Sequence, residues 1–179
     1  MLTTLSSGTI TLGTVTAASD TIDVNSITTV VDASGDITAA TLDIAAAGTV
    51  GLVGTPLTTT VTNLIATTSA GGIFVTESNA LVIAGAGVQV TNGTGNIELR
   101  VTAGDLTLTD DITANSSGTV TLVVLGADAA LITSDSNDDI VSGSGAISIT
   151  ADRLALVTGT ISSSGALTVS YTHLRAHET

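Results

Sequence analysis

The sequence predicts an all-β fold, a right-handed parallel β-helix (β-solenoid) of roughly seven or eight coils with no substantial helix. Two observations support this prediction. First, a phrase of Gly, any residue, an aliphatic residue, any residue and a second aliphatic residue recurs along the chain. Second, hydrophobic residues make up 43% of the sequence but aromatic residues only 1%, which suits narrow layers of stacked branched side chains better than an irregular globular core. The phrase begins at Gly8, Gly48, Gly95, Gly104, Gly118, Gly145 and Gly165.

Each copy of the phrase predicts a turn followed by a short strand, because its aliphatic residues alternate with polar ones. Further alternating segments lie between the copies, at residues 21–24, 41–44, 81–83 and 88–90. The interval from Gly8 to Gly35 is about one solenoid coil, whereas the shorter step from Gly95 to Gly104 indicates two strands within one coil. Coils stacked about 4.8 Å apart would give every strand a partner and close a dry interior.

The alternation also predicts which side chains point inward. Pro56, the only proline, fits a coil corner better than a central strand, and Phe74 is expected to fill the core or cap a corner. A tandem β-sandwich is the main alternative fold, although sandwiches usually bury Trp or Tyr. The expected core includes Ile10, Leu12, Ile97, Leu99, Leu106, Leu108, Val120, Leu122, Ile147 and Ile149.

Two parts of the chain differ in composition. Residues 1–168 read as a solenoid segment of a longer repeat array, truncated at both ends, and Met1 is compatible with an internal position. Residues 169–179 hold the only Tyr and both His of the chain, and they resemble the conceptual translation of a transposase-type sequencing adapter. We expect an artefactual, disordered tail there, with a natural polar C-terminus as the alternative. His173 and His177 are therefore not interpreted as metal ligands.

Charge and composition exclude several classes of function. The formal net charge is −13 and Lys is absent, which argues against nucleic acid and against an anionic membrane surface as partners. The chain has no Cys for a disulfide or a thiolate metal site. No run approaches the roughly 18 apolar residues of a membrane helix, so we expect no membrane insertion. The N-terminal residues do not resemble a signal peptide.

Residues 48–168 resemble the β-helix repeats of filamentous-haemagglutinin-like giant surface proteins of bacteria. The likeness is carried by residues 55–83, by residues 95–109 and by residues 147–161. The resemblance implies a non-catalytic shaft or stalk of an adhesin that is secreted or held at the bacterial cell surface. It implies contact with a host cell, a neighbouring cell or the extracellular matrix through loops or a missing tip, and stacking on flanking coils of the same chain. A secretion module and an outer-membrane barrel are not recognised in this sequence.

One segment carries enough oxygen ligands to suggest a metal site. Asp135, Asn137, Asp138 and Asp139 form the densest cluster of carboxylate and amide groups, and hard oxygen donors of this kind bind Ca²⁺. The spacing is neither that of an EF-hand nor that of the calcium-binding nonapeptide repeat. Since Asp and Asn are also favoured in turns, a solvated turn is the preferred interpretation, and no other cofactor is expected.

The alternative functions are those of a carbohydrate-active β-helix protein and of an ice-binding β-solenoid. A carbohydrate-active β-helix protein needs convergent carboxylates, cations and usually aromatic platforms, but Arg100 and Arg153 are the only cations outside the tail, so no enzyme is predicted. An ice-binding solenoid needs outward Thr in regular rows. Their irregular spacing favours ordinary strand residues. The Thr-x-Thr pairs are Thr9/Thr11, Thr14/Thr16, Thr60/Thr62, Thr107/Thr109 and Thr119/Thr121.

Overall fold

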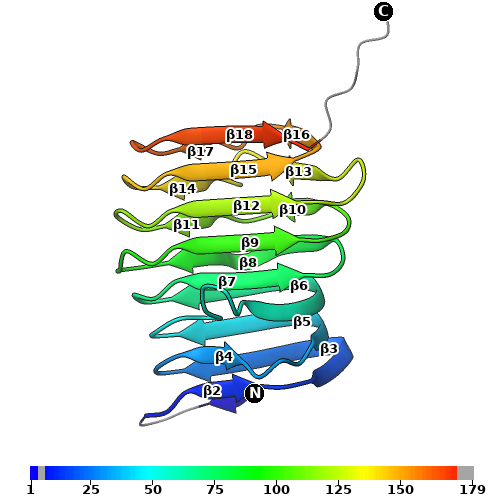
Figure 1. The fold of residues 1–179 in the computed structure, drawn as a ribbon, viewed down its shortest axis with the longest axis vertical. Coiled ribbons are helices and arrows are strands. Elements are labelled where there is room, and N and C mark those ends of the chain that lie inside the picture. The colour runs from blue at the N-terminus through cyan, green and yellow to red at the C-terminus, as the bar shows by residue number, and fades with distance from the viewer. Residues whose placement is uncertain (4–6, 173–179) are drawn as a thin grey trace, which may run out of the picture.

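The structure, a computed structural model, describes residues 1–3 and 7–172, and every regular element in them is a β-strand. The chain winds into a parallel β-solenoid of about eight turns, with its first and last strands at opposite ends of the stack (Figure 1). The predicted all-β solenoid is therefore confirmed, and the tandem sandwich is not what the chain forms. The described residues contain no helix long and apolar enough to cross a membrane.

One face of the solenoid carries most copies of the glycine phrase, and we call it the glycine face. Its strands run parallel, one per coil, and they lie at the front of Figure 1. Val50 continues the stack through isolated bridges to Val30 and Ile73. The strands are β2 (Ile10–Leu12), β4 (Val30–Asp32), β7 (Ile73–Glu77), β9 (Ile97–Val101), β12 (Val120–Val124), β15 (Ile147–Ala151) and β18 (Leu167–Tyr171).

The other two faces change character along the stack. In the early coils a single long strand covers both faces: these strands are β3 (Val15–Ser26), β5 (Ile37–Ala46), β6 (Leu57–Thr68) and β8 (Leu81–Val90). In the later coils each face has its own short strand. The second face then holds β10 (Leu106–Leu108), β13 (Ala130–Thr133) and β16 (Arg153–Leu156), and the third face holds β11 (Ile112–Ala114), β14 (Ile140–Ser142) and β17 (Ile161–Ser162). β1 (Leu2–Thr3) lies beside β3.

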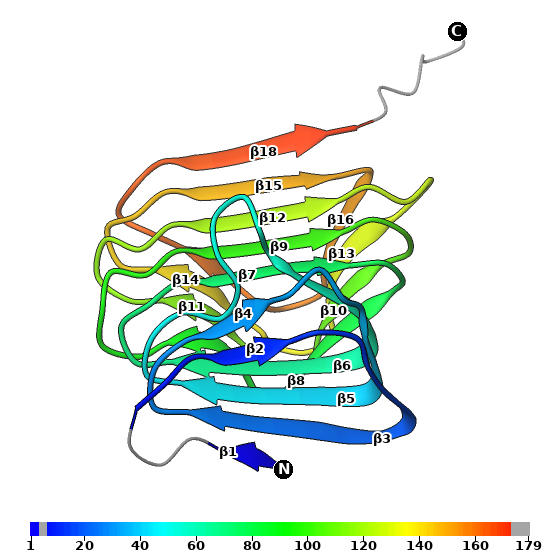
Figure 2. The same cartoon turned by 60° about the horizontal axis from the view of Figure 1, so that its bottom comes forward.

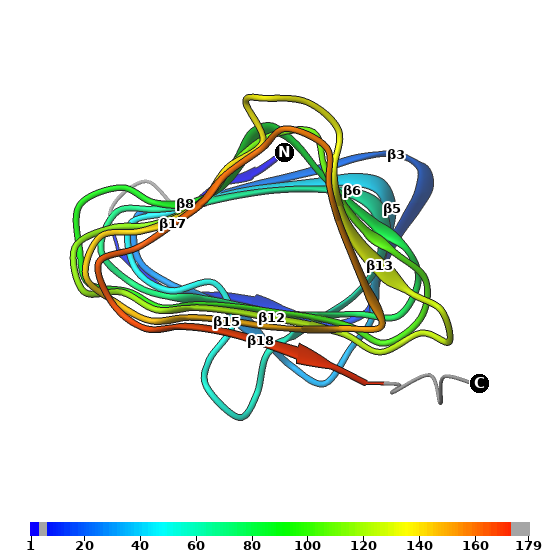
Figure 3. The same cartoon turned by 90° about the horizontal axis from the view of Figure 1, so that it is seen from above.

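The cross-section follows this change (Figure 3). Seen along the axis, the long strands β3, β5 and β6 pass from the second face to the third without a break, while the later coils turn at a third corner and enclose a triangle. Within the long strands the bend is accommodated by shifts of register, between Ala17 and Thr21 and between Leu64 and Ala66. Figure 2 shows the same strands from below.

The core consists of aliphatic columns that run along the axis. All ten predicted core residues are buried, and Leu106, Leu108, Ile149 and Val120 are fully enclosed at 0% exposure. Each such side chain contributes about 1.5–3 kcal/mol relative to an exposed one. The column at the start of the glycine face has eight rungs, formed by Ile10, Val30, Val50, Ile73, Ile97, Val120, Ile147 and Leu167.

The repeated glycine is explained by the corner between the third face and the glycine face. There the backbones of successive coils approach so closely that a Cβ atom on Gly95, Gly118 or Gly145 would overlap the glycine carbonyl of the coil below. One buried hydroxyl contributes to the same corner: Ser142 Oγ lies within hydrogen-bond distance of two carbonyl oxygens, that of Gly118 at 2.7 Å and that of Gly145 at 2.9 Å. The phrase starting at Gly104 is different, because it opens the second-face strand β10, which confirms two strands in that coil.

The structure also places Phe74, Pro56 and the end of the last strand. Phe74 does not fill the core: it is only 7% exposed but lies on the outer side of β7, where its ring packs against Gly72. Alternation explains this, since Ile73 and Val75 on the same strand point inward. Pro56 lies outside the strands, as predicted, but it belongs to the segment 51–56 that leaves the glycine face between Val50 and Leu57 and not to a coil corner. β18 continues to Tyr171, beyond the predicted boundary at 168, and residues 173–179 lie outside the described residues.

Candidate functional site

The predicted calcium ligands lie in the loop 134–139, which joins β13 to β14 at the corner between the second and third faces. Asp138 is 1% exposed, and its Oδ2 accepts hydrogen bonds from Ser134 N and Asp135 N at 2.6 Å each and from Ser134 Oγ at 2.8 Å. Asp135 Oδ1 accepts from Asn137 N at 2.7 Å. These oxygens therefore stabilise the backbone of their own turn.

Asp139 is directed away from that turn. Its Oδ1 accepts from the backbone N–H and the hydroxyl of Thr160, both at 2.8 Å, in the coil above. Within residues 1–3 and 7–172 no three His, Cys, Asp or Glu side chains gather in a way that could hold a metal ion. The four predicted ligands are thus neighbours in sequence, but the structure uses their carboxylates separately. The buried Asp138 Oδ1 has no hydrogen-bond partner among the described residues.

A ladder of side-chain caps runs along this corner and explains part of the acidic composition. Asp111 Oδ1 accepts from Asp139 N at 2.9 Å, and Asp139 Oδ1 in turn accepts from Thr160 N. Similar caps connect coils elsewhere: Asp105 Oδ1 accepts from Ala130 N at 2.7 Å. A carboxylate that accepts a backbone N–H makes a charge-assisted hydrogen bond, stronger than a neutral one. Several aspartates of this chain therefore connect neighbouring coils through hydrogen bonds to the backbone.

The most unusual polar residue is Glu77 at the end of β7, which sequence reasoning did not identify. It points into the interior, is 0% exposed, and lies in the ladder between Thr59 and Val101. Glu77 Oε2 accepts from Thr59 Oγ1 at 2.7 Å and from Val61 N at 3.1 Å. Its Oε1 accepts from the backbone N–H groups of Ser78 at 2.9 Å and Asn79 at 3.1 Å.

The Asn79 side chain completes this cage, because its amide nitrogen, oriented by the surrounding acceptors, also donates to Glu77 Oε1. Burial raises the pKa of Glu77 above its ordinary value, and the hydrogen bonds from Thr59, Val61, Asn79 and Ser78 oppose part of that rise. The parity of the strand was the available signal: Ile73, Val75 and Glu77 alternate on one side. With every bond directed to backbone or neighbouring side chains, Glu77 serves as a structural anchor.

A second electrostatic feature lies on the outer side of the long strands. Asp23 of β3 and Asp43 of β5 are direct partners in the parallel ladder. Partial burial raises the pKa of Asp43, and the negative charge of Asp23 raises it further. Like charges placed opposite each other destabilise a sheet. The pair consists of two carboxylates only and does not by itself constitute a metal site.

A short hairpin projects from the glycine face and is visible as the cyan loop outside the outline in Figure 3. It comprises residues 51–56 and is closed by reciprocal hydrogen bonds of 3.1 Å between Leu52 and Thr55. Positive φ angles at Gly51 (66°) and Gly54 (83°) allow the tight reversal. Leu52 is 41% exposed and Val53 75%, so the tip presents two aliphatic side chains to solvent. Sequence reasoning did not identify this element.

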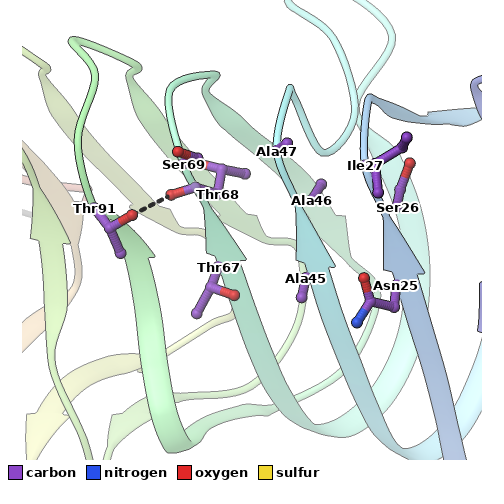
Figure 4. A pocket seen from close by; sticks show the side chains of 10 residues that line it. All are labelled: Asn25, Ser26, Ile27, Ala45, Ala46, Ala47, Thr67, Thr68, Ser69 and Thr91. Carbon is purple, nitrogen blue, oxygen red and sulfur yellow. Dashed lines mark hydrogen bonds between the residues drawn. The ribbon is translucent and has the colours of Figure 1, made fainter. Parts of the chain in front are cut away.

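A shallow groove of about 340 Å³ crosses the ends of β3, β5 and β6 (Figure 4). Ala45, Ala46 and Ala47 contribute only methyl groups to its lining. Thr91 Oγ1 donates to the Thr68 carbonyl at 3.2 Å along one wall. The lining offers methyl, hydroxyl and amide groups but no ionisable side chain: it comprises Asn25, Ser26, Ile27, Ala45, Ala46, Ala47, Thr67, Thr68, Ser69 and Thr91.

The structure also places the residues that bear on the alternative functions. Arg100 is exposed on β9 of the glycine face, while Arg153 is exposed on β16 of the second face, where its Nε donates to the Asp128 carbonyl at 3.0 Å. The two cations thus lie on different faces and do not converge.

The Thr-x-Thr pairs do not stack into one array. Thr11 is paired with Val31, and Thr121 lies between Glu98 and Ser148. One column of three, Thr16, Thr38 and Thr60, does form on the outer side of the long strands. Thr60 Oγ1 in that column is hydrogen-bonded to Asp36 Oδ2 at 2.9 Å.

Compared with protein-family models, with curated proteins and with solved structures, the chain gives no match. The fold and the geometry described above therefore carry the functional argument.

Proposed function

We propose that this chain is a structural shaft segment of a large bacterial surface or secreted protein of the adhesin type. Its role would be to extend and to display, without catalysis. The observation that carries the proposal is the eight-rung column of the glycine face, in which each rung pairs in parallel with the next, through isolated bridges on both sides of Val50. Backbone ladders and stacked aliphatic columns in this arrangement make a stiff rod.

The resemblance of residues 48–168 to filamentous-haemagglutinin-like repeats supports the same role and points to an extracellular or cell-surface location. In this proposal the shaft stacks on flanking coils of the same type, and adhesive contact with a host cell, a neighbouring cell or the matrix involves loops or a separate tip. The hairpin 51–56 is the loop best suited to such contact, because it combines a closed backbone with the exposed side chains of Leu52 and Val53.

Stiffness is tested by electron-spin distance measurements on the full chain. Spin labels at Thr11→Cys and Thr168→Cys lie seven rungs apart on the outer side of the glycine face, and we expect a narrow distribution centred at roughly 34 Å plus the label linkers. The matched pair Thr11→Cys and Thr121→Cys spans five rungs and should give roughly 24 Å plus linkers. A broad distribution for the seven-rung pair would contradict a rigid shaft.

Display is tested with the labelled chain on cultured cells, bacterial cells and matrix proteins. We expect measurable adsorption to at least one of these surfaces. Val53→Asp at the hairpin tip should weaken it, whereas Thr121→Asp on the flat glycine face should not. Equal loss in both variants would argue against the hairpin as the contact. Depolymerisation of a polysaccharide or thermal hysteresis by the purified chain would overturn the proposal in favour of an enzyme or an ice-binding protein.

A further inference from the structure

The corner between the third face and the glycine face carries two tripeptides that consist of Asn, any residue except Pro, and Ser or Thr. They are Asn92-Gly93-Thr94 and Asn115-Ser116-Ser117, and they lie in consecutive coils. This pattern is the acceptor sequence for N-linked sugars. Because a chain rich in Ser and Thr contains some such tripeptides by chance, the pattern is informative only where the fold presents it to solvent.

The first tripeptide lies in a turn that is anchored to the coil below. Asn92 lies between β8 and β9, and both Asn92 and Thr94 are exposed. The backbone N–H groups of Asn92 and Gly93 donate to the Ser69 carbonyl at 2.8 and 3.0 Å. The backbone of the turn is thus fixed while the Asn92 side chain stays exposed, so a transferase can reach the amide without unfolding the coil.

The two asparagine amides differ in how firmly they are held. Asn92 Nδ2 donates to Ser69 Oγ and to Thr91 Oγ1, each at 3.3 Å, which is longer than a usual N–H···O hydrogen bond. Asn115 is half-buried, and its Nδ2 donates to the Thr91 carbonyl at 2.8 Å. An amide with two long contacts is released more easily than one bonded to a backbone carbonyl, so Asn92 is the better acceptor.

Asn92 also lies at the rim of the groove shown in Figure 4, because both of its hydrogen-bond partners, Ser69 and Thr91, belong to the lining. The groove holds about 340 Å³, and its walls provide methyl, hydroxyl and amide groups without an ionisable side chain. Apolar surface with a few polar groups is typical of ligand sites, and here it matches the hydroxyls and the apolar edge of a sugar ring. The lining therefore suits a neutral sugar attached at Asn92.

We propose that Asn92 is the acceptor of an N-linked glycan whose first sugar lies along this groove, and that Asn115 is a secondary acceptor. In the transfer, Asn92 Nδ2 forms a bond to the anomeric carbon of a sugar activated by an anomeric phosphate ester. The bond between that carbon and the phosphate oxygen breaks, the phosphate leaves with its carrier, and one amide proton passes to a base of the transferase. The partner is thus a glycosyltransferase that uses a nucleotide-linked or lipid-linked sugar. Such a modification is independent of the shaft role proposed above.

The spacing of the two acceptors predicts how many glycans one chain carries. Successive coils stack about 4.8 Å apart, so a glycan at Asn92 would cover the approach to Asn115 in the next coil. We therefore expect one glycan per chain as the main product. Both asparagines lie outside the strands, so the modification leaves the backbone ladders intact.

The first test measures the intact mass of the purified 179-residue chain after incubation with a soluble N-glycosyltransferase specific for this tripeptide and a nucleotide-linked hexose. We expect the mass to rise by one hexose. Asn92→Gln should reduce the modified fraction about tenfold, whereas Asn115→Gln should leave it nearly unchanged. Thr94→Val should abolish modification at Asn92, and Thr94→Ser should preserve it, because the pattern requires the hydroxyl. Circular dichroism checks that each variant keeps the fold.

Several results would overturn the proposal. The folded chain would remain unmodified although the isolated peptide of residues 90–96 is modified, or the mass increase would persist when Asn92 and Asn115 are both replaced by Gln. Modification mainly at Asn115 would contradict the assignment of the primary acceptor. Asn96 is the internal control, since it is exposed at the same corner but is followed two residues later by Glu98, and sugar found on it would show that the tripeptide is not what is recognised.

The second test distinguishes the two sugar sources and examines the groove. Co-expression with a membrane-bound oligosaccharyltransferase and its lipid-linked donor should add a whole oligosaccharide at Asn92 if the source is lipid-linked, whereas modification by the soluble enzyme alone assigns a nucleotide-linked source. In the modified chain, nuclear magnetic resonance should show contacts between sugar protons and the methyl groups of Ala47 or Thr91. A sugar without such contacts would contradict its place in the groove. Spin-label distances on the unmodified chain test the shaft separately.

Discussion

The early coils, residues 15–90, and the later coils, residues 97–171, form the corner between the second and third faces in two different ways. In the early coils one strand of 10 to 12 residues crosses two faces and bends through a shift of register. In the later coils the strand breaks, and an aspartate-capped turn separates two strands of two to four residues. The glycine face is common to both regions. The corner between the third face and the glycine face is therefore kept in both regions, whereas the corner between the second and third faces is a bent strand in one region and a turn in the other.

The buried column shared by both regions gives the largest expected effect. Leu42 and Leu64 of the early coils stack below Ile83 and Leu108, and all four are 0% exposed. Leu108→Lys should cost several kcal/mol of unfolding free energy, because it buries an unpaired charge. Leu42→Lys should cost a similar amount if the core is continuous. Thr107→Lys, on the outer side of β10, is the control. Unchanged thermal melting of Leu108→Lys would contradict the buried column.

The invariant corner is tested by Gly118→Ala. A methyl group there would overlap the Gly95 carbonyl of the coil below, and we expect a loss of about 1–3 kcal/mol in chemical denaturation. Gly13→Ala is the matched control, since a Cβ at Gly13 meets nothing within 4 Å, and its stability should stay within about 1 kcal/mol of wild type. Similar stability of the two variants would show that the glycine corner tolerates side chains.

At the boundary between the regions, Glu77→Gln should lose about 1–3 kcal/mol, because an amide nitrogen would face the donors of Thr59 and Val61. Glu98→Gln on the exposed side of β9 should change stability by less than about 0.5 kcal/mol.

The Glu77 prediction has a pH dependence. Because burial raises the folded pKa above the ordinary 4.5, the stability associated with protonated Glu77 is complete below 4.5 and is lost as pH rises through the folded value. The free energy of unfolding of the wild type should therefore increase relative to that of Glu77→Gln as pH falls from 7 toward 4.5. If denaturation curves show that the difference in unfolding free energy between the two proteins becomes smaller over this range, the assigned burial of Glu77 is contradicted.

The capped corner of the later coils is tested by Asp139→Ala. It removes the acceptor of Thr160 N and Oγ1, and we expect a loss of about 1 kcal/mol. Hydrogen exchange should locate the effect at β17, with the long-strand coils unchanged, since each coil contacts only its neighbours. Ser136→Ala in the exposed part of the same loop is the control. Protection lost equally along the whole rod would contradict this local role.

The smallest effect is expected in the early coils. Asp43→Asn relieves repulsion from Asp23 and should stabilise the chain slightly at pH 7. Because the folded pKa of Asp43 is raised, the wild type recovers stability as pH falls through it, and the benefit of the variant should vanish below the ordinary value of 3.8. An advantage that persists at pH 3 would point to a cause other than charge.

The alternation of aliphatic residues was sufficient to predict the solenoid and its columns, because side-chain direction in a strand depends only on parity. The same alternation places Glu77 inward and Phe74 outward, because Ile73, Val75 and Glu77 share one side of β7, but neither side chain is predicted from it: Phe74 is expected in the core or at a corner, and Glu77 is not singled out. Neighbours across coils could not be predicted. The number of residues per coil varies, from 20 between Ile10 and Val30 to 27 between Val120 and Ile147. The sequence separation between a residue and its partner in the next coil therefore differs from coil to coil. The hydrogen-bonding roles of the aspartates depend on those offsets.

The hairpin at residues 51–56 leaves the glycine face after Val50, which only isolated bridges join to the neighbouring coils, and the chain rejoins the ladder at Leu57. Val50 contacts Ile73 before the detour, and Leu57 pairs with Val75 after it, so the ladder resumes in phase. The number of residues spent outside is thus uncoupled from the winding of the rod. The hairpin can therefore be lengthened, or replaced by another peptide, in evolution or by design, as a unit separate from the coils. The solenoid then serves as a scaffold for a displayed loop whose sequence can vary without a change in the fold.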